Sequence, residues 1–162
     1  MTSSAAQDLP TEAPLRSIIV GVDGSPAANR ALGWAVARAK EMGARVLVAH
    51  VLTYSTELRR DVSVDTVTTW RRDLRRRLEE EWATPALTGG IDARCELVED
   101  ESPAAGLLAL ARATSADLIV LGAHGRGSFA DRLLGATTYR VSHAAPAPVV
   151  IVPPDWQPVA AA

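Results

Sequence analysis

The chain has 162 residues, of which 48% are hydrophobic, and a formal net charge of -2. This length and composition suit one domain with a single buried core and leave little room for two. A charge so close to zero lacks the basic signature of nucleic-acid-binding proteins. The only cysteine, Cys95, excludes an intrachain disulfide framework, a cysteine-rich zinc site and a two-thiol redox motif, and it fits a reducing, cytoplasmic setting.

The ends of the chain predict its domain limits. Residues 1–14 have neither the basic start nor the apolar stretch of a secretory signal. No apolar run approaches the roughly 20 residues that a membrane-spanning helix needs. We therefore expect a disordered N-terminal tail over residues 1–14, one domain over residues 15–154, a C-terminal tail over residues 155–162, and a cytoplasmic location.

Five segments are predicted to be strands. Four are apolar almost without interruption, as parallel strands covered on both faces are. These are Ser17–Val22, Arg45–Val51, Asp117–Leu121 and Pro148–Val152. In the fifth, Ile91–Val98, apolar residues alternate with Asp92, Arg94 and Glu96, which indicates one solvated face and a place at the edge of the sheet.

Helical periodicity separates these strands. The first helix carries small and apolar residues on one face from Ala28 to Met42, and Gly43 is a plausible stop. The third begins at the N-cap Ser102 with Pro103 at its first position. The last starts near Gly135 and runs toward His143.

The second helix has apolar residues at three- and four-residue spacing from Val67 to Trp82, including Trp70, Leu74 and Leu78. Its surface offers ion pairs one helical turn apart. The predicted pairs are Arg75–Glu79, Arg76–Glu80 and Arg77–Glu81.

The resulting order βαβαβαβαβ predicts an α/β fold with one doubly wound parallel sheet and helices on both faces. Ligands of such sheets bind beyond the carboxyl ends of the strands. Two predicted strands are followed there by glycine-containing turns, in which the backbone can approach a ligand. The first continues into Asp23 and Gly24, and the fourth continues into Gly122, Gly125, Gly127 and Gly135.

Glycines after a strand let the backbone approach a phosphate, and the free N–H groups at the start of the next helix attract its charge. The segment matches neither G-x-G-x-x-G nor GxxxxGK[ST]. Lys40 is the only lysine, so arginine or backbone N–H groups would have to hold an anion. The spacing alone leaves phosphate binding open.

This segment resembles the universal stress protein family, whose ATP-binding members carry G-x2-G-x9-G-[S/T] after the fourth strand. Gly122, Gly125 and Gly135 have this spacing. The similarity also includes VGVDGSPAANRAL near the start and extends over about residues 16–153. It implies an adenine nucleotide alpha hydrolase-like fold with strand order 3-2-1-4-5, and a nucleotide-responsive regulator of stress adaptation with at most slow ATP turnover.

The resemblance also implies the site. Asp23 would lie at the adenosine side, the backbone around Val51 would line the adenine pocket, and the glycine segment would surround the ribose and phosphates of ATP, bound with Mg²⁺. Ala136 departs from the family's serine or threonine, which removes about one hydrogen bond, roughly 0.5–1.5 kcal/mol. The nucleotide-binding residues implied are Gly21, Val22, Asp23, Val51, Leu121, Gly122, Gly125, Arg126, Gly135, Ala136, Thr137 and Thr138.

Simpler interpretations of several polar residues stay open. Asp23 can cap the helix that follows it, and Ser128 with Asp131 has the spacing of a capping box. His50 and His143 can hydrogen-bond locally, and Cys95 suits a small core residue. Within the glycine segment, Arg126 is favoured over His124 for shielding phosphate charge, because its cation persists at neutral pH.

The last strand is wholly apolar and would expose unpaired backbone if it lay at an edge. In the family this strand joins two subunits, so the resemblance implies a homodimer through Val149, Val150, Ile151 and Val152. Flanking prolines at 146, 148, 153 and 154 would limit its extension. Two other functions remain open: a nucleotide-independent dimeric interaction module, which Ala136 favours, and a slow ATP hydrolase.

Overall fold

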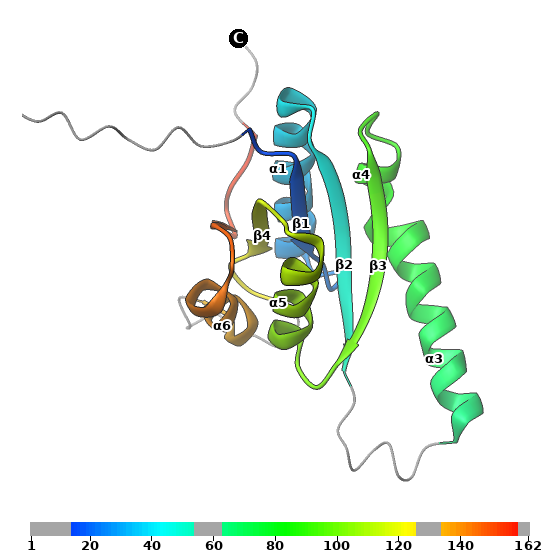
Figure 1. Cartoon of the computed structure of the whole chain (residues 1–162). Helices are drawn as coiled ribbons and strands as arrows, with labels where there is room; N and C mark the ends of the chain where they lie inside the picture. Colours follow the sequence, from blue (N-terminus) through cyan, green and yellow to red (C-terminus); the bar gives the residue numbers. More distant parts are fainter. Residues whose placement is uncertain (1–13, 54–62, 126–133, 159–162) are drawn as a thin grey trace, which may run out of the picture.

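The computed structural model describes residues 14–53, 63–125 and 134–158 (Figure 1). Helices and strands alternate along these segments. In chain order they are β1 (Ser17–Gly21), α1 (Pro26–Met42), β2 (Arg45–Thr53), α3 (Val64–Arg77), the π-helical turn η1 (Leu78–Trp82), α4 (Thr84–Leu87), β3 (Ala93–Asp100), α5 (Pro103–Thr114), β4 (Leu118–Gly122), α6 (Ala136–Ala144) and β5 (Val149–Val152). None of the helices in the described segments has the length and apolarity needed to cross a bilayer.

The strands form one parallel sheet in the order β3-β2-β1-β4-β5. This confirms the predicted fold class and the strand order 3-2-1-4-5. The alternating strand lies at the edge, as its pattern predicted, although it begins at Ala93 rather than Ile91 and continues to Asp100. β2 also runs beyond its predicted end at Val51, to Thr53.

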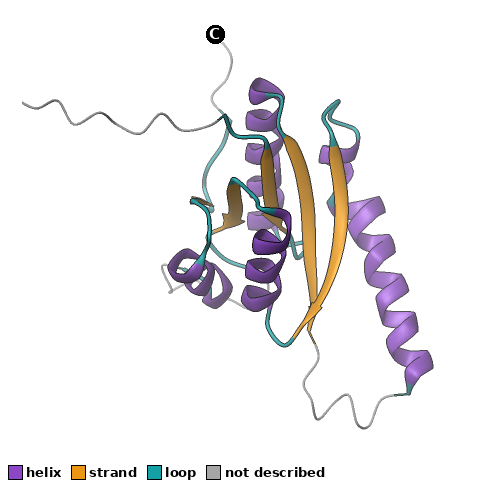
Figure 2. Ribbon diagram, viewed as in Figure 1, coloured by secondary structure: helices purple, strands orange, loops and turns teal. Residues whose placement is uncertain are grey.

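Helices cover both faces of the sheet, as predicted (Figure 2). On one face, α1, η1 and α4 pack over a core that includes Leu32, Val48 and Leu78. On the other face, α5 and α6 pack over a core that includes Leu107 and Val141. β1 and β4 are buried on both faces, which explains their uninterrupted apolar sequences.

The predicted helix ends rest on identifiable caps. Gly43 ends α1 in the left-handed region, with φ 67°, a conformation that glycine adopts at little cost. The Ser102 hydroxyl accepts a hydrogen bond from the Ala105 N–H at 3.1 Å and so caps α5. α6 begins at Ala136, directly after Gly135, as expected.

The second predicted helix differs most from expectation. α3 buries no side chain, and Trp70 is 40% exposed. After Arg77 the backbone forms a π-helical turn, closed by the Ala83 N–H and the Leu78 carbonyl at 2.8 Å. Such turns insert an extra residue into the helical repeat, and here Leu78 and Trp82 are both buried. The predicted apolar face is therefore confirmed from Leu74, which packs against the core, to Trp82, and is wrong at Trp70.

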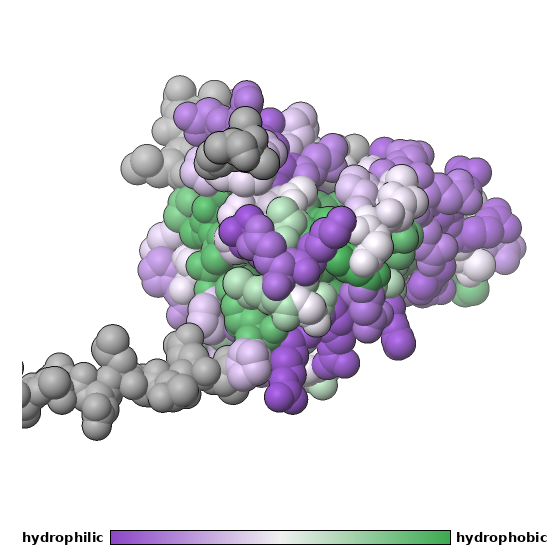
Figure 3. Space-filling model, turned by 90° about the horizontal axis from the view of Figure 1, so that it is seen from above, coloured by the Kyte–Doolittle hydropathy of each residue, from purple (hydrophilic) through white to green (hydrophobic). Residues whose placement is uncertain are grey.

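The surface charges of α3 and η1 pair nearly as expected. The Arg75–Glu79 and Arg77–Glu81 pairs are confirmed, with N–O distances of 3.8 and 3.5 Å. Arg76, in contrast, pairs with Asp73 at 3.6 Å rather than with the predicted Glu80. In Figure 3 hydrophilic residues predominate on the side of the molecule where α3 lies. The outer side of α3 is thus a charged, solvated surface.

Candidate functional site

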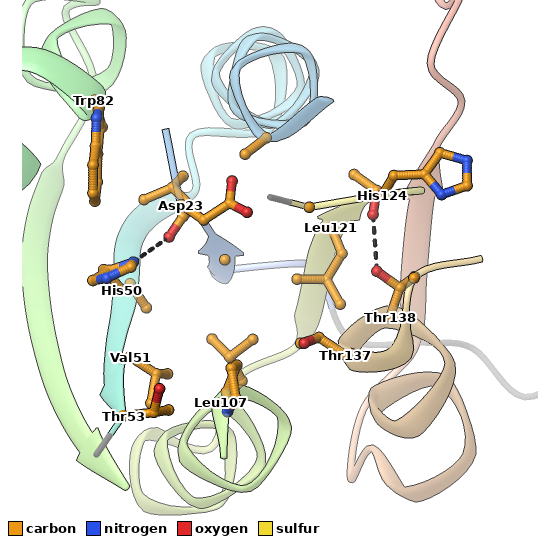
Figure 4. Close-up of a pocket in the computed structure, with 18 of the residues that line it drawn as sticks. Asp23, His50, Val51, Thr53, Trp82, Leu107, Leu121, His124, Thr137 and Thr138 are labelled. Carbon is orange, nitrogen blue, oxygen red and sulfur yellow. Dashed lines mark hydrogen bonds between the residues drawn. The ribbon is translucent and has the colours of Figure 1, made fainter. Parts of the chain in front are cut away.

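A cavity of about 610 Å³ lies beyond the carboxyl ends of β1, β2 and β4 (Figure 4). This is where ligands bind in sheets of this topology, and the volume is in the range of small-molecule sites. All but one of the residues implied by the sequence line it. These are Gly21, Val22, Asp23, Val51, Leu121, Gly122, Gly125, Gly135, Ala136, Thr137 and Thr138. Arg126 and the predicted capping box of Ser128 and Asp131 lie outside the described residues.

Asp23 connects the two loops that follow β1 and β4. Its Oδ1 accepts a hydrogen bond from the Ser25 N–H at 2.9 Å, and Ser25 in turn caps α1. Asp23 is therefore a turn residue with a local N–H partner, as the simpler interpretation predicted, but the helix cap itself is Ser25 and not Asp23. Its other oxygen, Oδ2, lies only 2.7 Å from the position that a Cβ on Gly125 would occupy. Asp23 thus has a structural contact on each side of the cavity wall.

Two of the glycines in the site are closely packed, one against backbone and one against side chains. A Cβ on Gly122 would lie 2.7 Å from the backbone carbon and oxygen of Ala27 in α1. A Cβ on Gly21 would lie 2.6 Å from the Leu121 side chain and 3.1 Å from Leu107. The backbone of Ala27 cannot give way, so position 122 excludes larger residues even without a ligand, whereas at position 21 the ends of the two leucine side chains would have to shift.

The start of α6 presents backbone N–H groups to the cavity. The first intrahelical bond joins the Tyr139 N–H to the Gly135 carbonyl at 2.9 Å, which leaves the N–H groups of Ala136, Thr137 and Thr138 without helical partners. The starts of α1 and α5 are capped by serine side chains. α6 instead has Gly135 at its N-cap position, with no side-chain cap. Its first turn is therefore suited to an anion.

The two threonines of this turn differ. The buried Thr138 donates its hydroxyl hydrogen to the Gly122 carbonyl at 2.9 Å, and so holds α6 against the end of β4. The Thr137 hydroxyl points into the cavity (Figure 4). Thr137 is therefore better placed than Thr138 to supply the hydroxyl that Ala136 lacks.

The end of β2 forms the opposite wall. The Arg45 N–H bonds to the Arg16 carbonyl, and the Ala49 carbonyl accepts the Val22 N–H at 2.8 Å. Odd-numbered residues of β2 therefore direct their backbone groups toward β1, and even-numbered ones toward β3. The last β1–β2 pair is Gly21 with Ala49. The N–H and carbonyl of Val51 consequently face the space beyond the end of β1.

Sequence reasoning did not assign two aromatic residues to this wall. His50 and Trp82 both line the cavity, and their rings meet edge to face with centroids 4.9 Å apart. The His50 Nδ1 lies 2.7 Å from the Val22 carbonyl. The position of His50 directly before Val51, at the carboxyl end of a strand, is a signal that could have found it. Trp82 comes from η1, and only the tertiary structure brings it here.

The charges around the cavity are few. Among the described lining residues, Asp23 has the only carboxylate, His50 and His124 are the only side chains that can become cationic, and there is no lysine or arginine. The His124 ring points away from the middle of the cavity (Figure 4). In the described part of the chain no three histidine, cysteine or acidic side chains are grouped to hold a metal ion. Within the described lining, backbone N–H groups are therefore the main source of positive potential.

The remaining polar predictions fall away from the cavity. Cys95 packs beside the core under η1, where burial, and then the nearby Glu79 carboxylate, raise the pKa of its thiol. The His143 ring lies 2.9 Å from the Tyr139 carbonyl, a local hydrogen bond as predicted. Neither residue lines the cavity.

Comparison with known proteins identifies relatives of the chain. The family model described as "Universal stress protein family" matches residues 14–153. A universal stress protein of Thermus aquaticus is 32% identical over 137 residues, which cover 85% of this chain and 98% of that protein. Among solved structures, the universal stress protein UspA of Lactobacillus plantarum is 25% identical, with a TM-score of 0.71 over 87% of this chain and 99% of its own.

A further solved structure is that of a universal stress protein in complex with cAMP. It is 26% identical to this chain and covers 86% of it, while the match covers 98% of that protein, with a TM-score of 0.67. The similarity thus extends over the whole sheet and includes both walls of the cavity.

Proposed function

The chain belongs to the universal stress protein family, and we propose that it binds an adenine nucleotide in the cavity and acts as a nucleotide-responsive regulator in a stress response. The observation that supports this proposal is that two sets of backbone hydrogen-bonding groups face the same cavity from opposite walls. The uncapped first turn of α6 suits phosphate, and the edge of β2 at Val51 suits a base. The relative in complex with cAMP supports an adenine nucleotide as the ligand class.

The phosphates would lie at the start of α6. The N–H groups of Ala136, Thr137 and Thr138 would donate to phosphate oxygens, and the helix dipole would favour their negative charge. The Thr137 hydroxyl is proposed to take over part of the role of the hydroxyl absent at Ala136. Arg126 is proposed to add a cation from the loop that precedes α6.

The base would lie against the end of β2. Adenine offers an acceptor at N1 and a donor at its amino group, side by side on one edge of the ring. The Val51 N–H and carbonyl offer the complementary donor and acceptor. The side chains of Leu107, Leu121 and Trp82 would make apolar contacts with the two faces of the adenine ring. Asp23, at the adenosine side, would maintain the loop that closes this part of the cavity.

ATP would be bound together with Mg²⁺. The ion is held in most nucleotide sites by phosphate oxygens with few protein groups. The donor set here fits such a minor contribution, since the Thr137 hydroxyl lies at the start of α6 while the Asp23 carboxylate lies at the adenosine side. The ion would neutralise phosphate oxygens that backbone N–H groups do not reach.

We propose that the nucleotide is held rather than consumed, with at most slow turnover. His50 and Asp23 are the described lining groups best placed to act as bases, and each already has a structural hydrogen bond, to the Val22 carbonyl and from the Ser25 N–H respectively. The bound and empty forms would differ in the surface offered to protein partners.

A homodimer through β5 is part of the proposal. β5 lies at one end of the sheet and pairs only with β4 among the described strands. Val149, Val150 and Ile151 are each partly exposed. A second copy of β5 would satisfy the open backbone groups of this strand and cover its apolar side chains.

The direct test is calorimetric titration of the purified protein with ATP, AMP and cAMP, each with and without Mg²⁺, together with analysis of any nucleotide released on denaturation. Binding of at least one adenine nucleotide is expected. A ligand at one hundred times its Kd stabilises a protein by about 2.7 kcal/mol. An unchanged melting temperature at millimolar concentrations of all three would contradict the proposal and favour the nucleotide-independent interaction module.

A further inference from the structure

The hydrogen bond between His50 and Val22 replaces a bond that the sheet would otherwise make. In the β1–β2 ladder, the Arg45 N–H bonds to the Arg16 carbonyl, and the bonds recur at every second residue of β2. The next odd-numbered residue after Ala49 is Val51, and its regular acceptor would be the Val22 carbonyl. That carbonyl instead faces His50 Nδ1 at 2.7 Å. The ladder thus stops one bond earlier than its register allows.

The chemistry of this contact fixes the role of each atom. A carbonyl oxygen only accepts hydrogen bonds, so Nδ1 must carry the hydrogen and donate it. Trp82 packs edge to face against the same imidazole, with the ring planes at 66°. The ring is therefore held between the Val22 carbonyl and the buried indole, and its orientation is constrained on two sides.

The consequence lies at Val51. Among the described residues no backbone carbonyl accepts the Val51 N–H, although Val51 is only 8% exposed. The N–H faces the cavity, where water or a ligand has to accept its hydrogen, because backbone N–H groups in proteins are nearly always paired. A ligand edge in the cavity would supply that partner.

We propose that His50 is a positioning residue that keeps β1 and β2 apart at their carboxyl ends and thereby reserves the Val51 N–H for the base of a bound nucleotide. The inference rests on the proposed function for the identity of the ligand, but the separation of the strands does not depend on it. Without the imidazole, the Val22 carbonyl would capture the Val51 N–H, the ladder would extend by one bond, and the base-recognition edge would be lost.

Three variants separate this role from simple packing. His50→Leu removes the donor. His50→Asn retains a donor, because the asparagine amide nitrogen occupies about the position of Nδ1, whereas the longer His50→Gln places its amide nearer the position of Nε2. The inference therefore predicts function in the asparagine variant and its loss in the leucine and glutamine variants.

The first measurement needs no ligand. Amide hydrogen exchange followed by NMR should show a fast-exchanging Val51 N–H in the wild type between the protected amides of Ala49 and Leu52. The Val51 amide should become protected in His50→Leu. A wild-type Val51 amide as protected as that of Ala49 would overturn the inference.

The second measurement compares AMP with inosine monophosphate, whose base reverses the donor and acceptor on the edge facing Val51. The wild type and His50→Asn should prefer AMP. His50→Leu and His50→Gln should bind AMP more weakly by a factor on the order of ten, as loss of one hydrogen bond predicts, and should lose the preference. Unchanged affinity and preference in both would overturn the inference. If the wild type bound none of AMP, ATP and cAMP, the proposed function would be contradicted, and the exchange experiment would still decide the role of His50.

Discussion

The carboxylate of Asp23 lies against the backbone of Gly125, because a Cβ at position 125 would come within 2.7 Å of Oδ2. The contact joins the loop after β1 to the loop after β4. The same carboxylate accepts a hydrogen bond from the Ser25 N–H through Oδ1. A displacement of the loop after β4 would therefore also move the loop after β1.

Gly125→Ala should therefore disturb the cavity through Asp23. The new methyl group would push the carboxylate away and weaken its bond to Ser25. We expect adenine nucleotide affinity to fall by a factor of about two to ten, the range for one weakened hydrogen bond. The matched background is Asp23→Ala, in which the methyl group has no carboxylate to displace. Equal effects of Gly125→Ala in both backgrounds, measured by calorimetry, would show that the contact is irrelevant to binding.

Gly122→Ala should destabilise the fold rather than act on the ligand alone. Its Cβ would meet the backbone of Ala27, which cannot move independently of α1, and overpacking of this kind costs about 1–3 kcal/mol. The control is Gly33→Ala in α1, where a Cβ meets nothing within 4 Å and a helical alanine gains about 1 kcal/mol over glycine. Urea denaturation should give opposite signs for the two variants, and a stabilised Gly122→Ala would refute the packing argument.

Ala136→Ser should strengthen binding of nucleotides that carry several phosphates. The substitution restores a hydroxyl at the first position of α6 and should raise ATP affinity by up to about tenfold, the equivalent of one hydrogen bond. AMP affinity should change less. Ala144→Ser, at the exposed far end of the same helix, controls for general effects on α6. Calorimetry of both variants is the measurement, and identical ATP affinities would count against phosphate at this helix start.

Asp117 should make the free energy of unfolding depend on pH in the acidic range. Its Oδ2 accepts hydrogen bonds from the N–H groups of Arg16 and Ser17 and from the Ser17 hydroxyl, at 2.9–3.0 Å. The Arg16 N–H first, and then the Ser17 hydroxyl, hold the carboxyl pKa below the ordinary value of 3.8.

A lowered pKa in the folded state means that the charged carboxylate stabilises the fold above the unfolded-state value of 3.8. This contribution is lost as the pH falls through the lower, folded-state pKa. The wild type should therefore have a larger free energy of unfolding than Asp117→Asn at neutral pH. This difference should shrink as the pH falls through the folded-state pKa of Asp117. A difference that stays constant from pH 7 to pH 2 in urea titrations would contradict this linkage.

A charged residue in β5 should prevent the proposed dimer from forming. Ile151 is partly exposed on β5, and Ile151→Arg would place a charge in the apolar contact. Light scattering after size-exclusion chromatography should give a dimer for the wild type and a monomer for the variant. Glu96→Arg puts the same side chain on the opposite edge strand and should leave the dimer intact. A monomeric wild type at micromolar concentration would exclude the proposal.

The sequence predicted the sheet well because its signals are local. The uninterrupted apolar runs of β1 and β4 follow from burial on both faces, and the alternation from Ala93 onward follows from an edge position. Helix caps such as Gly43 and Ser102 are likewise set by neighbouring residues. Features of this kind require no knowledge of the tertiary structure.

The errors and omissions depend on contacts between distant segments. Leu78 and Trp82 are buried through a π-helical turn, and nothing in the spacing from Val67 onward distinguishes that turn from a continuous α-helix. His50 gains its role only because the Val22 carbonyl lies where the next ladder bond would form. Gly122 matched a ligand-binding motif, yet its contact with Ala27 requires a glycine by itself.

Because Gly135 has no side chain to cap α6, the proposed ligand would become a structural component of the protein. α1 and α5 carry their own caps, whereas α6 would be completed only by the bound anion. The first turn of α6 should fray in the empty protein and become firm when phosphate is present. α6 buries Val141 in the same core that Val149 of β5 contacts. Ordering of α6 would therefore also affect β5 at the edge of the sheet. A protein partner would then meet a rigid α6 only in the nucleotide-bound form.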